Sequence, residues 1–275
     1  MSPISRTLRI TGECPDLFAL DPSIDHLIID NCEDEVFIPD LPGVKTLEIN
    51  RCNNLVITDL DPGLKHFSIS DCFEIKYLPH MPAGIESAMF RNCTLLMLES
   101  GSVSTRFGPR IPLLVIDRCP AILLETLPPC KELHLMNCMQ IDAISFPSTF
   151  DIEKLVMIGF IYGLAIRDVY SLKELVLKRA PGMGPVHASI NPSLANRLTH
   201  LEVVDLNQFQ APSEMSHMED LVILVNHMVK LPPMPHLESL ILSNQGALTN
   251  GHEIHDIYEY RMAWGQSRAK RPYQY

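Results

Sequence analysis

The chain has 275 residues and a formal net charge of −11, with 22 Lys and Arg against 33 Asp and Glu. This acidic balance disfavours nucleic acid as a partner, because phosphate binding needs a net basic face. Hydrophobic residues make up 46% and charged residues 20%, close to globular averages, which excludes a disordered chain. Pro is frequent, with 22 residues, and Gly is scarce, with 13, so Pro rather than Gly punctuates most of the turns.

A short phrase recurs along the chain at a nearly fixed spacing. It consists of an apolar anchor, a second apolar residue two places later and, in six repeats, a Cys five places after the anchor, as in Leu47, Ile49 and Cys52. A fixed period of about 20 residues indicates a repeat architecture, and chance does not produce so many copies in register. The anchors are Leu8, Leu27, Leu47, Phe67, Ala88, Leu114, Leu133, Leu155, Leu175, Leu201, Leu221 and Leu240.

The phrase resembles the leucine-rich repeat, L-x-x-L-x-L-x-x-(N/C), over roughly residues 4–245. Leu-Pro steps such as 41–42 and 127–128 make it similar to the short repeats of bacterial secreted effectors of the IpaH and YopM group, with Cys where those repeats usually carry Asn. The resemblance implies an α/β-type repeat solenoid with a curved parallel β-sheet on its concave face. A period near 20 leaves room on the convex face only for extended, 3-10 or short helical segments.

The repeats predict a solenoid of about twelve repeats over residues 1–248, followed by a cap and a basic, aromatic tail over residues 249–275. Asn250 and Glu253 are spaced like a capping box, which predicts a helix from about 251 to 263 that closes the end of the stack.

Two smaller segments are also distinctive. Asn191 and Pro192 occupy the positions of a helix cap and a first helical residue, which predicts a short helix within one of the longer repeats. Residues 266–275 fit either a frayed end or a docking tail.

The six repeated cysteines fit three interpretations: disulfides, metal ligands, or an inward structural ladder of buried thiols. Equivalent positions in stacked strands lie about 4.8 Å apart, whereas the Cβ atoms of a disulfide lie about 3.8 Å apart. The chain also lacks the C-x-x-C pairs of common metal sites. These points favour the ladder, and buried reduced thiols indicate a reducing, cytoplasmic compartment. The ladder consists of Cys32, Cys52, Cys72, Cys93, Cys119 and Cys138.

No motif of a serine hydrolase, P-loop, dinucleotide-binding fold or zinc protease is present in the sequence. His252 and His255 are only three residues apart and no ligand cluster follows, so an exposed helix face is favoured over a metal site. The effector ligases carry a catalytic Cys in a separate C-terminal domain, whereas the 31 residues after Asn244 contain no Cys. We therefore expect no enzyme activity, no cofactor and no metal.

The ends and the apolar runs bear on localisation. The first six residues lack the apolar core of a signal peptide, and the longest apolar run, 155–166, is too short to span a membrane. We expect a cytoplasmic protein without a membrane span. The effector resemblance adds delivery to a host cell without a cleavable signal peptide as an alternative.

The concave positions one and three residues after each anchor divide the chain into a polar and an apolar part. In the first five repeats two of ten such positions are apolar, whereas in the last seven nine of fourteen are. A large exposed apolar patch generally marks an interaction site, although strand propensity or cover by another part of the chain would also explain the pattern. The residues of this strip are Val115, Met136, Val156, Ile158, Val176, Val204, Val222, Leu224 and Ile241.

These observations favour a non-catalytic protein-binding module of the effector or adaptor type, which binds a protein partner through its concave face. A structural subunit of a larger particle, with self-association through the strip or the 266–275 tail, is the second interpretation. The substrate-recognition part of a ubiquitin-ligase system is the third.

Overall fold

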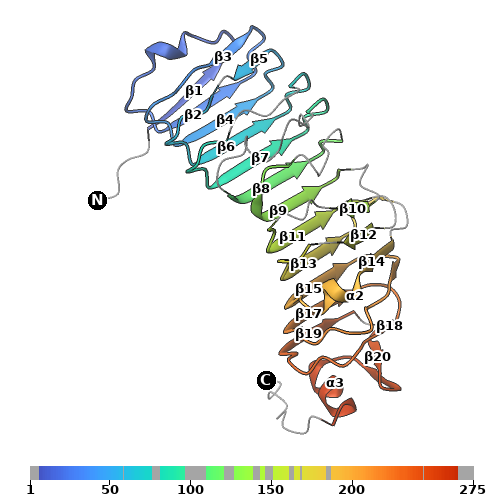
Figure 1. The fold of residues 1–275 in the computed structure, drawn as a ribbon. Helices are drawn as coiled ribbons and strands as arrows, with labels where there is room; N and C mark the ends of the chain where they lie inside the picture. The colour runs from blue at the N-terminus through green and yellow to red at the C-terminus, as the bar shows by residue number, and fades with distance from the viewer. Residues whose placement is uncertain are drawn as a thin grey trace, which may run out of the picture. The chain divides into compact units, whose positions relative to one another are not determined.

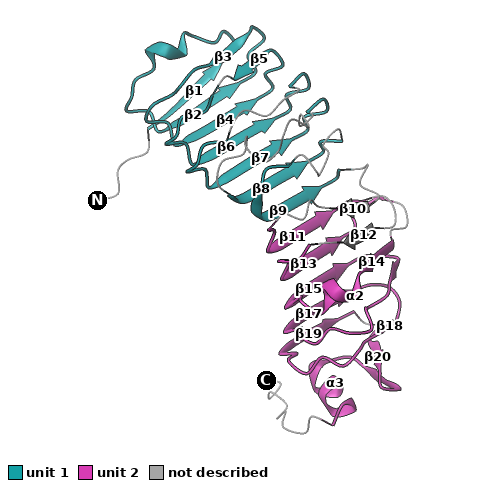
Figure 2. Cartoon of the chain, viewed as in Figure 1, with its two compact units in different colours: residues 1–140 teal, residues 141–275 magenta. Residues whose placement is uncertain are grey.

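The computed structural model describes residues 6–57, 59–75, 81–96, 110–120, 127–138, 143–145, 151–160, 164–167, 169–183, 187–243 and 245–265. The chain forms two compact units, residues 1–140 (unit 1) and residues 141–275 (unit 2), which Figure 2 distinguishes by colour.

Unit 1 is a stack of parallel strands, one from each repeat. The register places each anchor beside the next, so that Leu27 pairs with Leu8 on one side and with Leu47 on the other. The returning parts of the repeats contribute a 3-10 helix, η1 (Leu17–Ala19), and two short parallel strands, β3 (Val36–Ile38) and β5 (Leu55–Ile57). The main strands are, in spatial order, β1 (Thr7–Thr11), β2 (His26–Asp30), β4 (Thr46–Asn50), β6 (His66–Ser70), β7 (Ser87–Arg91), β8 (Ile111–Asp117) and β9 (Cys130–Met136) (Figure 1).

Unit 2 repeats this arrangement. Its main strands are, in spatial order, β11 (Lys154–Ile158), β13 (Glu174–Lys178), β15 (His200–Val204), β17 (Asp220–Leu224) and β19 (Ser239–Leu242). Its returning segments pair in parallel as β10 (Ala143–Ser145), β12 (Leu164–Arg167), β14 (His187–Ile190) and β16 (Gln208–Phe209), and also as β18 (Val229–Lys230) with β20 (Ala247–Thr249). β21 (His252–Ile254) runs antiparallel to β20, and the helices are α2 (Pro192–Ala195) and α3 (Ile257–Ala263).

The alternation of side chains along each main strand builds the core. Leu47 and Ile49 in β4, for example, are buried, whereas Thr46, Glu48 and Asn50 are half-buried on the opposite face of the sheet. Stacking the repeats joins these inward pairs into one continuous apolar layer within each unit, which no single repeat could bury alone.

The turn that ends each strand has a conserved geometry along the stack. In nine of the repeats the residue four places after the anchor adopts a left-handed conformation, with φ between 51° and 58° where it is not Gly, whereas Arg179 and Val225 at the same place do not. The amide at this place continues the ladder into the next repeat, as from Asn31 N to Asn50 O at 2.9 Å. Asn, Asp and Gly tolerate this conformation best, and they fill most of these positions. The residues are Gly12, Asn31, Arg51, Asp71, Asn92, Arg118, Asn137, Gly159 and Asp205.

The expected repeat solenoid is confirmed, in the form of a parallel β-solenoid with very little helix. The returning segments are not helical layers: several pair as short strands of two to four residues, because repeats of about 20 residues leave no room for a longer element. The short helix predicted at Asn191 and Pro192 is confirmed, with the Asn191 side chain accepting a hydrogen bond from Ser193 N at 3.0 Å.

The predicted C-terminal helix begins later than expected. Residues 252–254 form β21, so His252 and Glu253 lie on a strand and not on a helix face, and α3 begins only at Ile257. Asp256 is the actual cap, since its Oδ1 accepts a hydrogen bond from Glu259 N at 2.8 Å. The predicted tail, 266–275, lies outside the described residues.

Candidate protein-binding surface

The candidate surface is the open face of the main sheets, defined by the side chains one residue before, one after and three after each anchor. These side chains point away from the core because the strand period is two. Their chemistry differs between the two units: unit 1 carries ion pairs and hydrogen bonds, and unit 2 carries most of the apolar strip.

In unit 1, Asp30 is a buried carboxylate held by arginines from both neighbouring repeats. Arg51 donates to its Oδ1 from Nε at 3.1 Å and from Nη2 at 2.7 Å, and Arg9 Nη1 lies 3.6 Å from Oδ2. The two arginines are largely exposed, so they compensate the buried charge while presenting their own to solvent.

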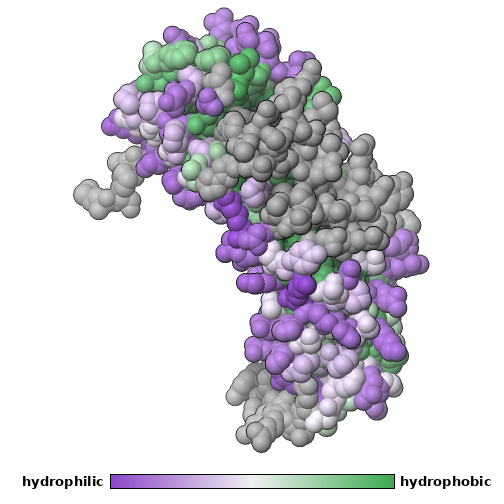
Figure 3. Space-filling view, viewed as in Figure 1, coloured by the Kyte–Doolittle hydropathy of each residue, from purple (hydrophilic) through white to green (hydrophobic). Residues whose placement is uncertain are grey.

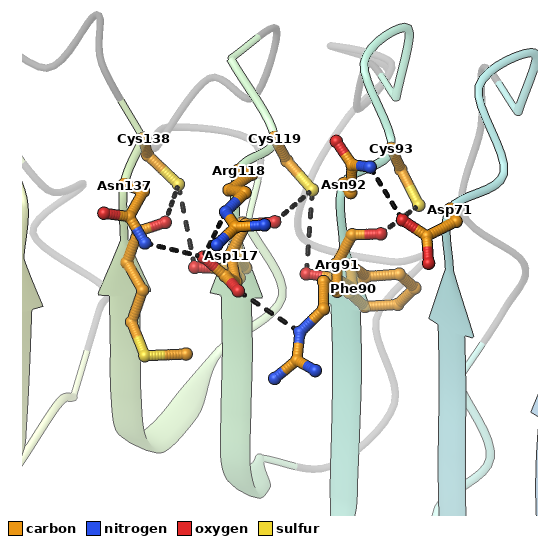
Figure 4. Close-up of polar contacts among 12 residues, drawn as sticks. Asp71, Phe90, Arg91, Asn92, Cys93, Asp117, Arg118, Cys119, Asn137 and Cys138 are labelled. Atoms are coloured by element: carbon orange, nitrogen blue, oxygen red, sulfur yellow. Dashed lines mark hydrogen bonds and ion pairs between the residues drawn. The ribbon is translucent and has the colours of Figure 1, made fainter.

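A second buried carboxylate, Asp117, lies four strands along the sheet, on β8, and also has partners from both neighbouring repeats (Figure 4). Asn137 Nδ2 donates to its Oδ1 at 3.0 Å, and Arg91 Nε lies 3.2 Å from Oδ2. Arg118, from the same repeat, is more distant, with 3.9 Å between Nε and Oδ1. These lateral contacts fix the open face of unit 1 as a rigid polar surface with exposed guanidinium groups.

The repeated thiols lie on the inner side of the same turns (Figure 4). All six are buried and free, and from Cys52 onward each Sγ donates to the carbonyl oxygen two residues earlier, at 3.2 to 3.4 Å. Cys119 and Cys138 also donate to carbonyls of the preceding repeat, Phe90 O and Ile116 O, both at 3.6 Å. The thiols therefore satisfy carbonyl groups where the strands end.

Burial raises the pKa of Cys72 to about 12, and burial together with the neighbouring thiols Cys52 and Cys14 raises the pKa of Cys32 to about 12. Cys93 differs, because its side-chain hydrogen bond with Cys119 lowers the pKa of its thiol. Cys130, which begins β9, is a further buried thiol whose pKa is raised to about 12 by burial. A neutral thiol is a poor nucleophile and a poor metal ligand, so the raised pKa values make Cys32, Cys72 and Cys130 unreactive near neutral pH.

Burial divides the predicted apolar strip of unit 2 into two parts. Val156 and Val176, paired in register on β11 and β13, are only 8% and 7% exposed. Leu224 and Ile241, on β17 and β19, are 36% and 51% exposed. Ile158, Val204 and Val222 are half-buried.

The remaining strip residues, Val115 and Met136, belong to unit 1. Val115 is buried and Met136 is half-buried, and they lie on the neighbouring strands β8 and β9. The exposed part of the strip is therefore at the C-terminal end of the sheet in unit 2.

Carboxylates border this exposed end. Elsewhere in unit 2 the acidic groups of the open face are paired, with Lys178 Nζ 2.8 Å from Glu202 Oε1. Asp220, which begins β17, and Glu219 and Glu238, which precede β17 and β19, have no Lys, Arg or His within 4.0 Å among the described residues.

Two surface features of unit 1 were not predicted from the sequence. One is the pairing of Asp30 with Arg51 and of Asp117 with Asn137 across neighbouring repeats, for which the sequence signal is an Asp three places after an anchor and an Arg or Asn four places after the next anchor. The other is an exposed aromatic pair, Phe18 and Phe37, whose rings stack with centroids 5.7 Å apart. Figure 3 shows an apolar area at this end of unit 1, over η1 and β3.

Within the described ranges, no three His, Cys, Asp or Glu side chains converge as a metal site, and no helix is long and apolar enough to cross a membrane. His255 Nε2 lies 3.4 Å from Glu253 Oε1, and both side chains are exposed. In comparisons with known proteins, no family model, no curated protein and no solved structure matches the chain.

Proposed function

We propose that this chain is a non-catalytic protein-binding module that holds a protein partner on the open face of its parallel sheet. The observation that carries the proposal is the pair Leu224 and Ile241, two large aliphatic side chains exposed on neighbouring strands of a rigid sheet. Val222 pairs with Ile241 in register, so the exposed groups are contiguous. Exposed apolar surface that is held in place by a sheet suits a protein partner more than a solvent-facing role.

We also propose that the repeats are of the leucine-rich type. The proposal is supported by the twelve-fold anchor phrase, by the left-handed turn before each repeated Cys, and by the burial of the anchor and second apolar residue in every repeat between the first and the last. Under this assignment the open face is the usual binding surface of the solenoid.

Affinity capture from an extract of the source cells, read out by mass spectrometry, tests the binding proposal. The double variant Leu224→Asp, Ile241→Asp places charges on exposed positions, so it should leave the free energy of unfolding nearly unchanged and abolish capture of the partner.

The matched control is Phe18→Asp, which makes the same kind of change at a side chain that is 73% exposed in unit 1. It should retain the partner. Equal capture by the wild type and the double variant, with both folded, would show that this surface does not bind.

A further inference from the structure

The C-terminal end of the sheet in unit 2 combines exposed aliphatic side chains with carboxylates that have no basic partner among the described residues. We call it the acidic-apolar platform and define it by Glu219, Asp220, Val222, Leu224, Glu238 and Ile241. Glu238 N donates to Glu219 O at 2.7 Å, so the two glutamates stand side by side where β17 and β19 begin. At about 3.3 Å per residue, Val222 and Ile241 lie about 10 Å further along the strands than Glu219 and Glu238, and Leu224 lies about 17 Å beyond Glu219.

The chain emerges from α3 beside this platform. Arg261 Nη2 donates to Leu237 O at 2.9 Å, which ties the last turn of α3 to the segment that leads into Glu238 and β19. Trp264 Nε1 donates to Thr249 Oγ1 at 2.9 Å and so fixes the indole at the end of the helix.

A hollow of about 360 Å³ lies between the end of α3 and the turns before β15, β17 and β19. Trp264, Pro233, Pro235 and Met215 form its apolar walls, and its polar lining consists of Asn196, Ser213, Glu214 and Ser216. Asn196 Nδ2 donates to Glu214 Oε2 at 2.8 Å. Aromatic and proline side chains of this kind can bind an extended peptide segment. Neither the segment nor the walls of the hollow would need to form new secondary structure on binding. The hollow therefore provides a path from the end of α3 toward the acidic part of the platform.

The platform fits an extended segment in which cations precede aromatic rings. Cations would face Glu219, Asp220 and Glu238, and rings would cover Leu224 and Ile241. The chain carries this pattern directly after Gly265: residues 266–275 contain Arg268, Lys270 and Arg271, followed by Tyr273 and Tyr275. Ten extended residues reach about 33 Å, which is enough to pass the hollow and cross the platform.

We propose that residues 266–275 bind intramolecularly to the acidic-apolar platform and compete with the partner for Leu224 and Ile241. The inference rests on the proposed function, since it assigns an internal competitor to the same surface. The charge match sets the direction of docking, and the short connection through Gly265 keeps the segment at high effective concentration.

Hydroxyl-radical footprinting of the full chain tests this. In the triple variant Arg268→Glu, Lys270→Glu, Arg271→Glu, like charges oppose docking, so the oxidation rates of Leu224 and Ile241 should rise several-fold over the wild type. Phe18, remote in sequence and in unit 1, should be oxidised equally in both and serves as the internal control. Equal rates at Leu224 and Ile241 in the two proteins would overturn the proposal.

Charge reversal on the platform provides the complementary arm. Adding Glu219→Arg, Asp220→Arg and Glu238→Arg to the triple variant should restore the protection of Leu224 and Ile241. Protection that increases with protein concentration would overturn the intramolecular form, because it would come from a second copy.

A synthetic peptide of residues 266–275 measures the interaction directly. It should bind the full chain carrying the triple variant and lose affinity by about tenfold, equivalent to ~1.4 kcal/mol, when Leu224→Asp and Ile241→Asp are added. These assays contain no partner, so their failure leaves the proposed function standing. If instead the partner fails to bind while the footprint changes as expected, only the proposed function is lost.

Discussion

Arg51 donates two hydrogen bonds to Oδ1 of Asp30, at 3.1 Å from Nε and 2.7 Å from Nη2, across two neighbouring repeats. Arg51 holds this position in a left-handed conformation, with φ of 55°, which an Arg side chain adopts only at an energetic cost. Arg118 occupies the equivalent turn with the same φ, but its Nε lies 3.9 Å from the nearest oxygen of Asp117. Both arginines therefore adopt the unfavourable left-handed conformation, but only Arg51 forms short hydrogen bonds to the neighbouring Asp.

The first prediction follows from this difference. Asn tolerates the left-handed conformation, so Arg118→Asn should raise the free energy of unfolding by about 0.5 kcal/mol. Arg51→Gly should lower it, because Gly also accepts the left-handed conformation but leaves the buried carboxylate of Asp30 without its closest donors. Urea unfolding followed by circular dichroism measures both changes. If both variants shift in the same direction, the Arg51–Asp30 contact does not stabilise the fold.

A second prediction concerns pH. The pKa values of Cys32, Cys72 and Cys130 are raised by burial from 9.0 to about 12. Between pH 9 and pH 12 these thiols ionise in the unfolded chain but stay protonated in the folded chain. The folded state therefore binds more protons, and its stability is full below pH 9 and falls as the pH rises toward 12.

Urea midpoints at pH 8, 9, 10 and 11 measure this decline. Cys72→Ala should reduce stability at pH 8, since it removes a buried thiol and its hydrogen bond to Ser70 O, and should make the decline with pH shallower. A decline with the same slope in Cys72→Ala and in the wild type would contradict the role of burial at this thiol.

The repeat could be predicted from the sequence, and so could the side chains that point into the core or toward the open face, because both depend on local periodicity. Leu27 and Leu47 pair in register as the anchor spacing requires, and Asn191 caps α2 as its neighbour Pro192 indicates. The start of α3 was not predictable in the same way. Asn250 and Asp256 are each followed three residues later by Glu, and only the pairing of β21 with β20 decides between them.

Which residues of the apolar strip are exposed could not be predicted from the sequence either. Period two places Val176 and Ile241 on the same face, but it does not say how closely their neighbours pack. Val176 lies between Val156 and Glu202 on adjacent strands, whereas Ile241 lies on β19, which ends the sheet and has Val222 on one side. A side chain flanked on both sides is covered, and one flanked on a single side stays open.

A third prediction uses this contrast. Val176→Asp should lower the free energy of unfolding by about 2 kcal/mol or more, because it places a carboxylate at a position that is only 7% exposed. Ile241→Asp, on the same face but 51% exposed, should change stability by less than about 0.5 kcal/mol. Thermal unfolding of the two variants tests the difference. Equal loss of stability in both would show that burial does not determine how well a strip position tolerates a charge.

The fourth prediction concerns the end of the stack. Tyr260 is fully buried in α3, where its hydroxyl donates to Pro232 O at 3.0 Å and accepts from Met234 N, and burial raises its pKa to about 12. Tyr260→Phe should cost about 1–3 kcal/mol, because the Met234 amide and the Pro232 carbonyl lose their partner in a buried setting. Hydrogen exchange of the Met234 amide should accelerate in the same variant. The control is Tyr170→Phe, at a ring that is largely exposed, which should change neither the stability nor the exchange rate. If Tyr260→Phe also changes neither of them, the Tyr260 hydroxyl does not hold α3 against the last repeat.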